Sequence, residues 1–407
     1  MLKKNLTLIK EGSVKFYIYN IDEGQIPSKS MNTFYNKRME INRDISTLAI
    51  NAYTDLYQQK NLIIIDSMAA SGISSIRILR ECKNAKKIFI NDINPEAIRI
   101  IKKNIKLNSL NHSPIKIIIS RKDANFLFSE IASKKCKNLD EMQESPNVIS
   151  IDPFGTPNLY IDSAFKTIQK RNGLMCITAT DTAVLFGIRP DVCIRKYFAK
   201  PLHNEYCKEI GSRILVYFIS RIANLNKIGI IPLLTFYSGH FIRIFCLTFK
   251  NKRKITESFG NIGYIIHCKN CGYRSSFRNN ILEIPKECPL CLNKKTLDYA
   301  GPLWIDKIHN LNFIKKMLYL NENSKFQNKK RIGKLLSFIA EENNMPVSYY
   351  NIHILCQNLG LTSIPKIQDI IETIEKIGYQ SSRTHFNFLS IKTNLDLNTL
   401  KKLLIDI

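Results

Sequence analysis

Four short apolar runs in the first half of the chain each end in, or just before, an aspartate. They occupy residues 62–66, 87–92, 115–123 and 148–152, and their aspartates are Asp66, Asp92, Asp123 and Asp152. Short continuous apolar runs are typical of strands that are buried on both faces of a parallel sheet. Between the runs, apolar residues recur at helical spacing, as at Ile98, Ile101 and Ile105. Strands that alternate with helices predict an α/β fold built on a parallel sheet.

The positions of the four aspartates predict one ligand-binding cleft. A single aspartate at the end of a strand is usually a turn former, but the carboxyl ends of parallel strands meet at one edge, where open α/β sheets bind ligands. The turn after residue 66 contains Gly72, which would let the backbone approach a ligand closely. It has one glycine rather than three, so the dinucleotide-binding fingerprint is absent. Asp92 follows about twenty residues later, where nucleotide-binding folds of this kind place a ribose-binding carboxylate.

Further apolar segments extend this pattern. Residues 173–179 predict a fifth strand, and residues 233–249 predict a hairpin turning at Gly239 and His240 that closes the sheet with an antiparallel edge. Residues 1–30 predict strands followed by a polar loop. A helix that runs through Ile45 leads into the sheet, and Arg43 at its start could clamp a carboxylate with two hydrogen bonds. A solvated surface charge is the simpler interpretation of Arg43.

The segment from Asp152 to Phe154 has the residue types needed to hold a flat ring that carries an amino group. Pro153 fixes its own φ and has no N–H, so Phe154 is expected to lie at a defined angle to Asp152. The ring would stack on Phe154 while its N–H donates to the Asp152 carboxylate. The alternative is an ordinary Asp-Pro turn with Phe154 in the core.

Two CxxC pairs predict a structural metal site in the second part of the chain. They are Cys268 with Cys271 and Cys288 with Cys291. Four thiolates at this spacing favour tetrahedral zinc in a zinc ribbon, with no open position for catalysis. The alternative is a pair of redox dithiols, but nothing around them resembles a thioredoxin.

A run of charge at residues 250–254 marks the expected domain boundary. We therefore predict a first domain at residues 1–250, with an N-terminal β extension at 1–30, and a smaller α+β domain with the zinc ribbon at 251–407. Residues 348–359 and 365–377 predict two helices followed by a strand at 381–389, the order of a winged-helix module. Arg383 and His385 could then contact phosphate, although a plain packing domain fits almost as well.

Charge points to a nucleic-acid partner. The 407 residues include 60 Lys and Arg against 34 Asp and Glu, a formal net charge of +26, and basic surfaces bind phosphate backbones. The alternative is a Lys-rich, Ile-rich proteome that tolerates a basic surface. We find no signal peptide and no membrane-spanning run. Eleven cysteines, of which only four have metal spacing, suit the reducing cytoplasm.

A series of short motifs resembles the tRNA (guanine-26-N2)-dimethyltransferase family. They are FYN at 34–36, NRD at 42–44, ASGI at 70–73, NDIN at 91–94, DAN at 123–125, DPFG at 152–155, ATDT at 179–182, CIRKY at 193–197, GPLW at 301–304 and SRTHF at 382–386, together with both CxxC pairs. Each motif is weak alone, but their order covers nearly the whole chain. Lys37 and Ser74 depart from the family pattern, which expects proline and often a basic residue there, and Asn158-Leu159 also differs.

The resemblance implies a Rossmann-like class I methyltransferase domain that uses S-adenosylmethionine, with tRNA as partner. It implies catalytic roles for Asp152, Phe154 and Phe34, with Asp152 accepting an N–H of guanine N2 and both rings stacking on a flipped base. It implies that the cofactor is bound by Arg43, Gly72, Arg77, Asp92, Asp123 and Ala124. Because Ser74 replaces a basic residue, Arg77 is the expected second arginine for the cofactor carboxylate. We infer no obligate protein partner.

Two other functions remain compatible with the residues. An amino-methyltransferase acting on adenine or cytosine, in RNA or DNA, would use the same acid-proline-aromatic motif. The second is a non-catalytic RNA-binding protein that keeps the cofactor-binding fold but has lost the cofactor. The presence of four strand-end aspartates and of Arg43 argues against the loss of cofactor binding.

Overall fold

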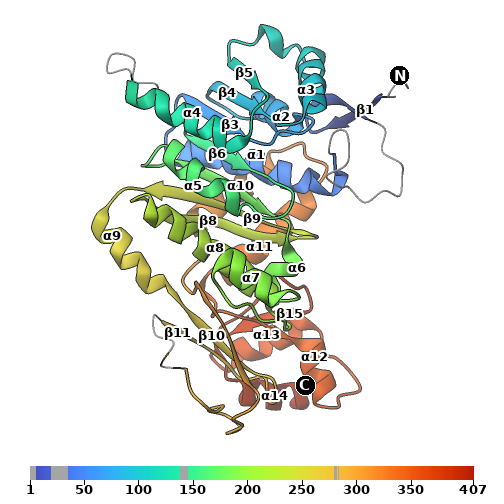
Figure 1. Ribbon diagram of the computed structural model, residues 1–407. Coiled ribbons are helices and arrows are strands. Elements are labelled where there is room, and N and C mark those ends of the chain that lie inside the picture. The colour runs from blue at the N-terminus through green and yellow to red at the C-terminus, as the bar shows by residue number, and fades with distance from the viewer. Residues whose placement is uncertain (1–5, 20–34, 138–144, 279–281, 283) are drawn as a thin grey trace.

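A seven-stranded sheet forms the centre of the protein in the computed structural model, which describes residues 6–19, 35–137, 145–278, 282 and 284–407. The strand order is β5-β4-β3-β6-β7-β9-β8, and the first five are parallel (Figure 1). The strands are β3 (Leu62–Asp66), β4 (Ala85–Asn91), β5 (Lys116–Ser120), β6 (Val148–Ile151), β7 (Leu174–Ala179), β8 (Gly229–Ser238) and β9 (Phe241–Phe249). The predicted parallel sheet and its antiparallel hairpin edge are therefore confirmed.

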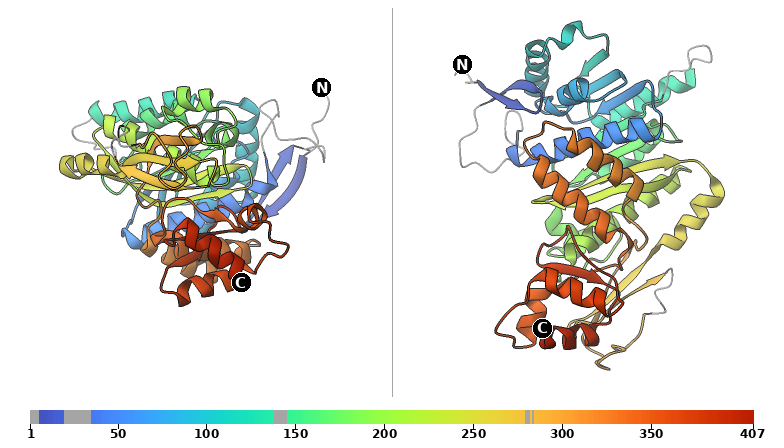
Figure 2. Two further views of the ribbon diagram at one scale, coloured as in Figure 1. Left: turned by 90° about the horizontal axis from the view of Figure 1, so that it is seen from below. Right: turned by 180° about the vertical axis from the view of Figure 1, so that it is seen from behind.

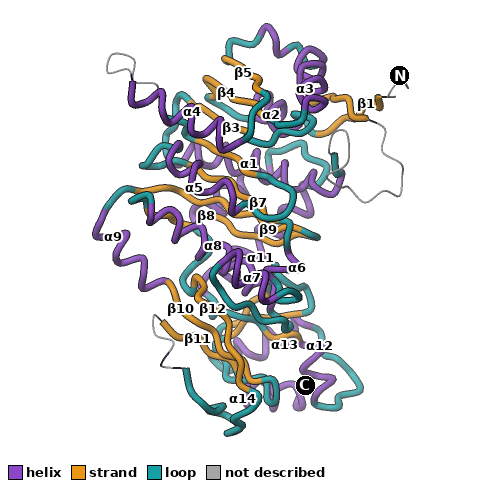
Figure 3. Tube along the Cα trace, viewed as in Figure 1, coloured by secondary structure: helices purple, strands orange, loops and turns teal. Residues whose placement is uncertain are grey.

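Helices cover both faces of this sheet, which explains the continuous apolar runs (Figure 3). In β3, Ile63 and Ile65 belong to one core while Leu62 and Ile64 belong to the other, because successive side chains of a strand point to opposite faces. The first face carries α4 (Ala124–Lys137), α5 (Asn158–Thr167) and α8 (Cys207–Leu225). The second carries α1 (Glu40–Leu56), α2 (Ile73–Glu81) and α3 (Pro95–Leu107).

The N-terminal strands β1 (Leu6–Glu11) and β2 (Val14–Tyr19) pair as an antiparallel hairpin and lie against α3. The Asn104 side chain on α3 pairs with both backbone groups of Tyr17, at 2.6 and 3.1 Å. This contact fixes the hairpin, and with it Glu11, beside α2. The predicted polar loop at 22–30 lies outside the described residues.

The second part of the chain begins with α9 (Lys252–Glu257) and the three-stranded sheet β11-β10-β12. Its strands are β10 (Ile262–Cys268), β11 (Arg274–Arg278) and β12 (Leu297–Trp304). Two helices follow, α10 (Leu311–Glu322) and α11 (Lys329–Glu341), and they pack on α1 at the back of the molecule (Figure 2, right). Because α10 and α11 share a core with the first part, the division at residue 250 remains a prediction.

The C-terminal segment contains the predicted succession of two helices and a strand. A small sheet of order β13-β15-β14 is flanked by helices, in the elements β13 (Tyr350–Asn351), α12 (Ile352–Asn358), α13 (Ile367–Lys376), β14 (Ser381–Arg383), β15 (Ser390–Thr393) and α14 (Leu397–Asp406). The expected strand at 381–389 is shorter, because the chain leaves the sheet after Arg383 and returns as β15. Among the described helices, none has the length and apolarity to cross a membrane.

Candidate functional site

The loop that follows β6 is held rigidly at the carboxyl edge of the sheet. The Gly155 N–H donates to Thr180 Oγ1 at 2.7 Å, and the Thr180 N–H donates back to the Gly155 carbonyl at 2.9 Å. Thr156 Oγ1 lies 3.1 Å from the Tyr197 hydroxyl. Phe154 is 41% exposed, so the alternative in which this ring belongs to the core is wrong. The loop presents Asp152 and an accessible aromatic face on a fixed backbone.

A polar floor lies next to this loop, on the sheet face covered by α1 and α2. It consists of Asp66, Ser150, Thr178 and Arg243. In each strand, the residue on the same face two positions away is apolar and belongs to the core under α1 and α2. Asp66 accepts a hydrogen bond from Ser75 Oγ at 2.6 Å. Burial raises the pKa of Asp66 to about 6, the nearby Asp152 adds to this rise, and the Ser75 hydrogen bond opposes it. The floor therefore joins β3, β6, β7 and β9 at the edge of the sheet where Asp152 follows β6.

Arg243 in this floor is a buried cation held by hydroxyl groups. Its guanidinium donates to Thr178 Oγ1 at 2.6 Å, to Ser46 Oγ at 3.2 Å and to Ser150 Oγ at 3.3 Å. Within the described ranges it has no carboxylate within ion-pair distance, and its Nε has no hydrogen-bond partner. A buried charge is costly, and although Asp66 is close enough to interact with it electrostatically, no carboxylate binds it directly, so Arg243 is suited to stabilise negative charge of a ligand at this edge of the sheet. Sequence reasoning missed it, because its register opposite Thr178 appears only once the hairpin is paired.

The predicted cofactor-binding residues occupy the ends of β3, β4 and β5. Asp92 accepts the N–H of Ala70 at 2.8 Å and that of Asn94 at 2.9 Å, and burial raises its pKa. Asp123 caps α4 by accepting the Asn125 N–H at 2.9 Å, and Ala124 is buried behind it. The charges of Asp92 and Asp152 both raise the pKa of Asp66, so these three of the four aspartates lie near one another. Asp66 itself is buried.

Packing explains why residue 72 is a glycine. Its φ is +78°, and a Cβ at this position would lie 2.9 Å from Cγ1 of Ile101 on α3. The glycine thus allows a left-handed turn and the close approach of α2 to α3. A contact between Gly72 and the cofactor stays a prediction.

The two predicted arginines both bind carboxylates of the protein itself. Arg43 binds Glu11 through two hydrogen bonds of 2.6 Å. Arg77 is fully buried and pairs with Glu11 at 2.9 Å, Asp44 at 2.7 Å and Glu81 at 3.0 Å. Burial alone would raise the pKa of Glu11, but the two guanidinium groups outweigh it and lower that pKa. The structure thus places Arg77 in an ion-pair network between the N-terminal hairpin and α2.

The tip of the β8–β9 hairpin lies close to Asp152. His240 at this tip lies 3.3 Å from Asn36 Nδ2. Burial and the nearby Arg38 lower the pKa of His240, while Asp152 acts in the opposite direction. Sequence reasoning treated His240 only as a turn residue. Phe34, the second predicted stacking ring, lies outside the described residues.

The four predicted metal-binding cysteines form one cluster. The sulfur atoms of Cys268, Cys271, Cys288 and Cys291 all lie within 4.8 Å of one another. Burial alone would raise the pKa of Cys268, but hydrogen bonds from the Thr296 hydroxyl and from the Cys271 and Asn270 amides lower it to about 6. The surroundings of Cys268 therefore favour its thiolate, which is the form that binds metals, whereas burial raises the pKa of Cys271.

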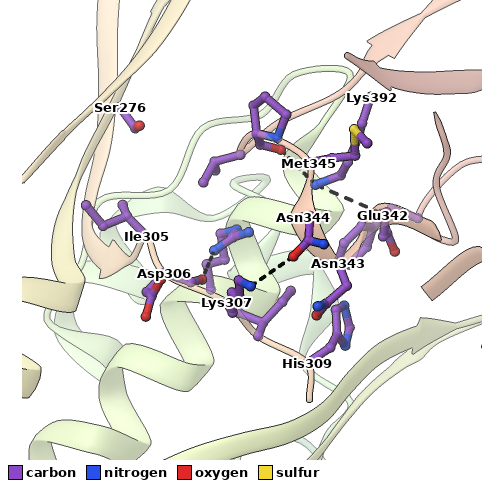
Figure 4. A pocket seen from close by; sticks show the side chains of 15 residues that line it. Ser276, Ile305, Asp306, Lys307, His309, Glu342, Asn343, Asn344, Met345 and Lys392 are labelled. Carbon is purple, nitrogen blue, oxygen red and sulfur yellow. Dashed lines mark hydrogen bonds and ion pairs between the residues drawn. The ribbon is translucent and has the colours of Figure 1, made fainter. Parts of the chain in front are cut away.

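A second cluster has metal-binding residue types but a different arrangement. It comprises His309, Glu342 and His385, which are buried beside a cavity of about 460 Å³. Figure 4 shows His309, Glu342 and Lys392 along one side of this cavity. Glu342 accepts hydrogen bonds from Thr384 Oγ1 at 2.5 Å and from His385 Nδ1. His385 is therefore an interior residue, and the idea that it contacts phosphate is wrong.

Comparisons with known proteins agree over nearly the full length. The family model described as N2,N2-dimethylguanosine tRNA methyltransferase matches residues 12–405. A tRNA (guanine(26)-N(2))-dimethyltransferase from Methanosphaera stadtmanae is 36% identical over 98% of this chain and 97% of its own length. One from Methanobrevibacter smithii is 37% identical over 97% and 96%.

A solved structure has the same fold. The complex of Trm1 from Pyrococcus horikoshii with S-adenosyl-L-methionine superposes with a TM-score of 0.81 at 29% identity, and the match covers 98% of this chain and 99% of that one. The sequence, the sheet with its Asp152 loop and the full-length matches agree. The chain belongs to the N2,N2-dimethylguanosine tRNA methyltransferase family.

Proposed function

We propose that this protein transfers methyl groups from S-adenosylmethionine to the exocyclic N2 of guanine 26 in tRNA, giving N2-methyl- and N2,N2-dimethylguanosine. The observation that carries the proposal is the rigid loop from Asp152 to Gly155 at the carboxyl edge of the sheet, in a chain that matches the family from end to end. The net charge of +26 suits a tRNA substrate.

The cleft has the donors and acceptors that the cofactor needs. Asp92 lies at the end of β4 with each oxygen accepting one backbone N–H, so lone pairs remain for ribose hydroxyls. In the turn that precedes α2, Ser71 Oγ is buried with no hydrogen-bond partner among the described residues. A buried polar atom of this kind fits the polar end of a ligand. Arg243 supplies positive charge beside the Asp152 loop, whereas the charge of Arg43 is already paired with Glu11.

The cofactor supplies an electrophilic methyl group when it is bound. The residues of the chain then have to present guanine N2, a poor nucleophile because its lone pair is delocalised into the ring. Asp152 accepts an N–H of this amino group, which favours a pyramidal nitrogen and stabilises the positive charge that develops on it. Phe154 stacks on the base, and Pro153 keeps both groups at a fixed angle. His240 lies close enough to the same carboxylate to interact with it electrostatically.

We also assign a structural Zn²⁺ to Cys268, Cys271, Cys288 and Cys291. Four sulfur atoms within 4.8 Å of one another are compatible with a tetrahedral site with Zn–S distances of about 2.3 Å. Since all four ligands are protein thiolates, such an ion has no open position, and its role is to fold the β10–β12 segment.

The decisive experiment replaces the Asp152 carboxylate by its amide. Asp152→Asn keeps the shape of the side chain but removes its charge, so methyl transfer should fall by about 10²–10⁴-fold. The assay uses labelled S-adenosylmethionine and an unmodified tRNA transcript, followed by digestion and identification of the labelled nucleoside. Thermal unfolding and cofactor binding by calorimetry should remain as in the wild type.

The same assay tests the target. Label in N2-methylated guanosine should disappear when the base at position 26 is replaced in the transcript. Near-normal turnover of Asp152→Asn would refute the role of Asp152, and label on adenine or cytosine would refute the choice of guanine.

A further inference from the structure

Helix α7 (Pro190–Tyr197) and the turns at its two ends expose large apolar side chains next to the Asp152 loop. Ile188 is 61% exposed, Ile194 46% and Phe198 65%. Ile194 lies on α7 itself, Ile188 lies in the turn before it, and Phe198 is the residue that ends it. Large apolar side chains that are exposed close together along a short segment are candidates for an interaction site. We call Ile188, Ile194 and Phe198, with Arg189 and Arg195, the α7 platform.

The platform is joined to the Asp152 loop by direct hydrogen bonds. Asn158 Nδ2 donates to the Lys196 carbonyl at 2.5 Å. Tyr197 is buried, lies 3.1 Å from Thr156 Oγ1 and donates to Asp181 Oδ1 at 2.7 Å. These contacts fix the end of α7, immediately before Phe198, against the residues that follow Phe154. The exposed side chains at the end of α7 therefore lie beside the loop on which the reacting group of a substrate would be held.

Phe198 has a backbone conformation that its side chain disfavours. Its φ is +54° and its ψ +35°, which places it in the left-handed region at the end of α7. Helices commonly end this way, but usually with glycine, because a Cβ is unfavourable there. The Phe198 ring is mostly exposed, so burial of the ring does not offset this cost. A strained and exposed aromatic residue beside a reactive loop is typical of a functional site.

The charge of the platform identifies the kind of partner. Arg189 and Arg195 are exposed, and neither forms an ion pair in the part of the chain that the structure describes. Lys196 and Lys200 lie next to them but pair with Asp181 and Asp298. Asp191 is the acidic residue of the exposed helix face. Exposed aromatic and aliphatic groups flanked by unpaired arginines match an unstacked nucleotide, with its base on the ring and its phosphate on a guanidinium.

We propose that the α7 platform binds a nucleotide of the substrate tRNA that flanks the target guanine. Phe198 stacks on the base of this nucleotide, Ile188 and Ile194 extend the apolar contact, and Arg189 and Arg195 bind the adjoining phosphates. The target base leaves the stack to reach Asp152, and its neighbour then loses a stacking partner. Phe198 supplies that partner. This inference rests on the proposed function, since it takes tRNA as the substrate of the Asp152 loop.

Phe198→Gly separates this role from a structural one. Glycine relaxes the left-handed backbone, so the melting temperature should stay constant or rise, whereas loss of stacking should weaken tRNA binding by about tenfold or more. Binding is measured by fluorescence anisotropy with a labelled tRNA transcript, and KM for tRNA should rise while the affinity for S-adenosylmethionine stays unchanged. Phe198→Trp should restore binding. The matched control is Leu225→Ala, at a residue that is 70% exposed at the end of α8.

The contribution of Arg189 and Arg195 is tested by the salt dependence of tRNA binding. Arg189→Ser and Arg195→Ser should each reduce the slope of log K against log salt by about one. If the wild type methylates tRNA but Phe198→Gly binds it as tightly as the wild type, the platform is refuted and the proposed function stands. If the wild type transfers no methyl group to tRNA, the proposed function fails, and the inference fails with it.

Discussion

Two clusters of metal-binding residue types lie in the second half of the molecule, and they are built in opposite ways. The cysteine cluster takes its ligands from two knuckles seventeen residues apart, counted from Cys271 to Cys288, and its sulfur atoms face one another. The cluster of His309, Glu342 and His385 takes its residues from three separate segments. In the first cluster, local hydrogen bonds favour a thiolate at Cys268. In the second, Glu342 accepts hydrogen bonds from Thr384 and His385, while Nε2 of His309 and Nε2 of His385 have no hydrogen-bond partner among the described residues.

The second cluster is balanced without a metal ion. The Thr235 N–H donates to His309 Nδ1 at 3.3 Å, so the neutral ring carries its proton on Nε2 and has no lone pair there. Lys392 Nζ lies 2.7 Å from Glu209 and 4.0 Å from Glu342, and Arg213 pairs with Glu209 at 2.9 Å. Two carboxylates thus face two cations. The comparison teaches that the residue types of a cluster do not alone decide whether it binds a metal: Glu342 is already engaged by Thr384, His385 and Lys392, whereas the four cysteines face one another.

The largest expected effect that tests this comparison is the loss of the metal itself. Native mass spectrometry should find one zinc ion per chain, and Cys288→Ser should abolish it and unfold the β10–β12 segment, because structural zinc contributes on the order of 10 kcal/mol in small zinc-binding peptides. Cys207→Ser, which changes a cysteine outside the cluster, should retain the zinc. Two zinc ions per chain, or one that persists in Cys288→Ser, would contradict the comparison.

A smaller effect is expected when Glu342 loses its charge. Glu342→Gln leaves His385 without its buried carboxylate, while Lys392 keeps Glu209, and breaking such a buried pair costs about 3–5 kcal/mol. Denaturant unfolding at neutral pH measures the change. The neighbouring Glu341 is exposed, so Glu341→Gln should change stability by less than ~0.5 kcal/mol. If a chelator reproduced the loss in the wild type without affecting the cysteine cluster, the second cluster would have to be a metal site.

Features that depend on neighbouring residues could be predicted from the sequence, whereas features that depend on partners far apart in the chain could not. The strands of the sheet, the β8–β9 hairpin and the cysteine pairs follow from patterns within a few residues, and the structure confirms them. The partners of Arg77 do not, because Glu11 reaches it from a separate hairpin. The proximity of His240 to Asp152 and the register of Arg243 likewise depend on how distant strands pair. Sequence locates the edge where ligands bind, whereas tertiary packing decides which charged residues remain available there.

The pH dependence of stability provides the finest test of the second cluster. Burial, reinforced by the nearby His385, lowers the pKa of His309 well below its ordinary value, so the folded protein keeps this ring neutral. The unfolded chain takes up a proton at His309 below about pH 6.5. Stability is therefore complete above that pH and is lost as pH falls below it, by up to about 1.4 kcal/mol per pH unit.

His309→Asn should remove this dependence while keeping an acceptor for the Thr235 N–H. The measurement compares the free energy of unfolding at pH 7.0 and pH 5.5 in both proteins, and the wild type should lose more on acidification. Glu342, whose pKa is lowered to about 2 because His385 and Lys392 outweigh the effect of burial, titrates in a separate window. Its contribution is complete above about pH 4.3 and is lost only as pH falls toward 2. Protonation of the cysteine cluster affects both proteins equally and cancels in the difference. An equal loss in the two proteins would mean that His309 is protonated in the folded state, and the neutral hydrogen-bonded arrangement that distinguishes this cluster from the cysteine site would then be wrong.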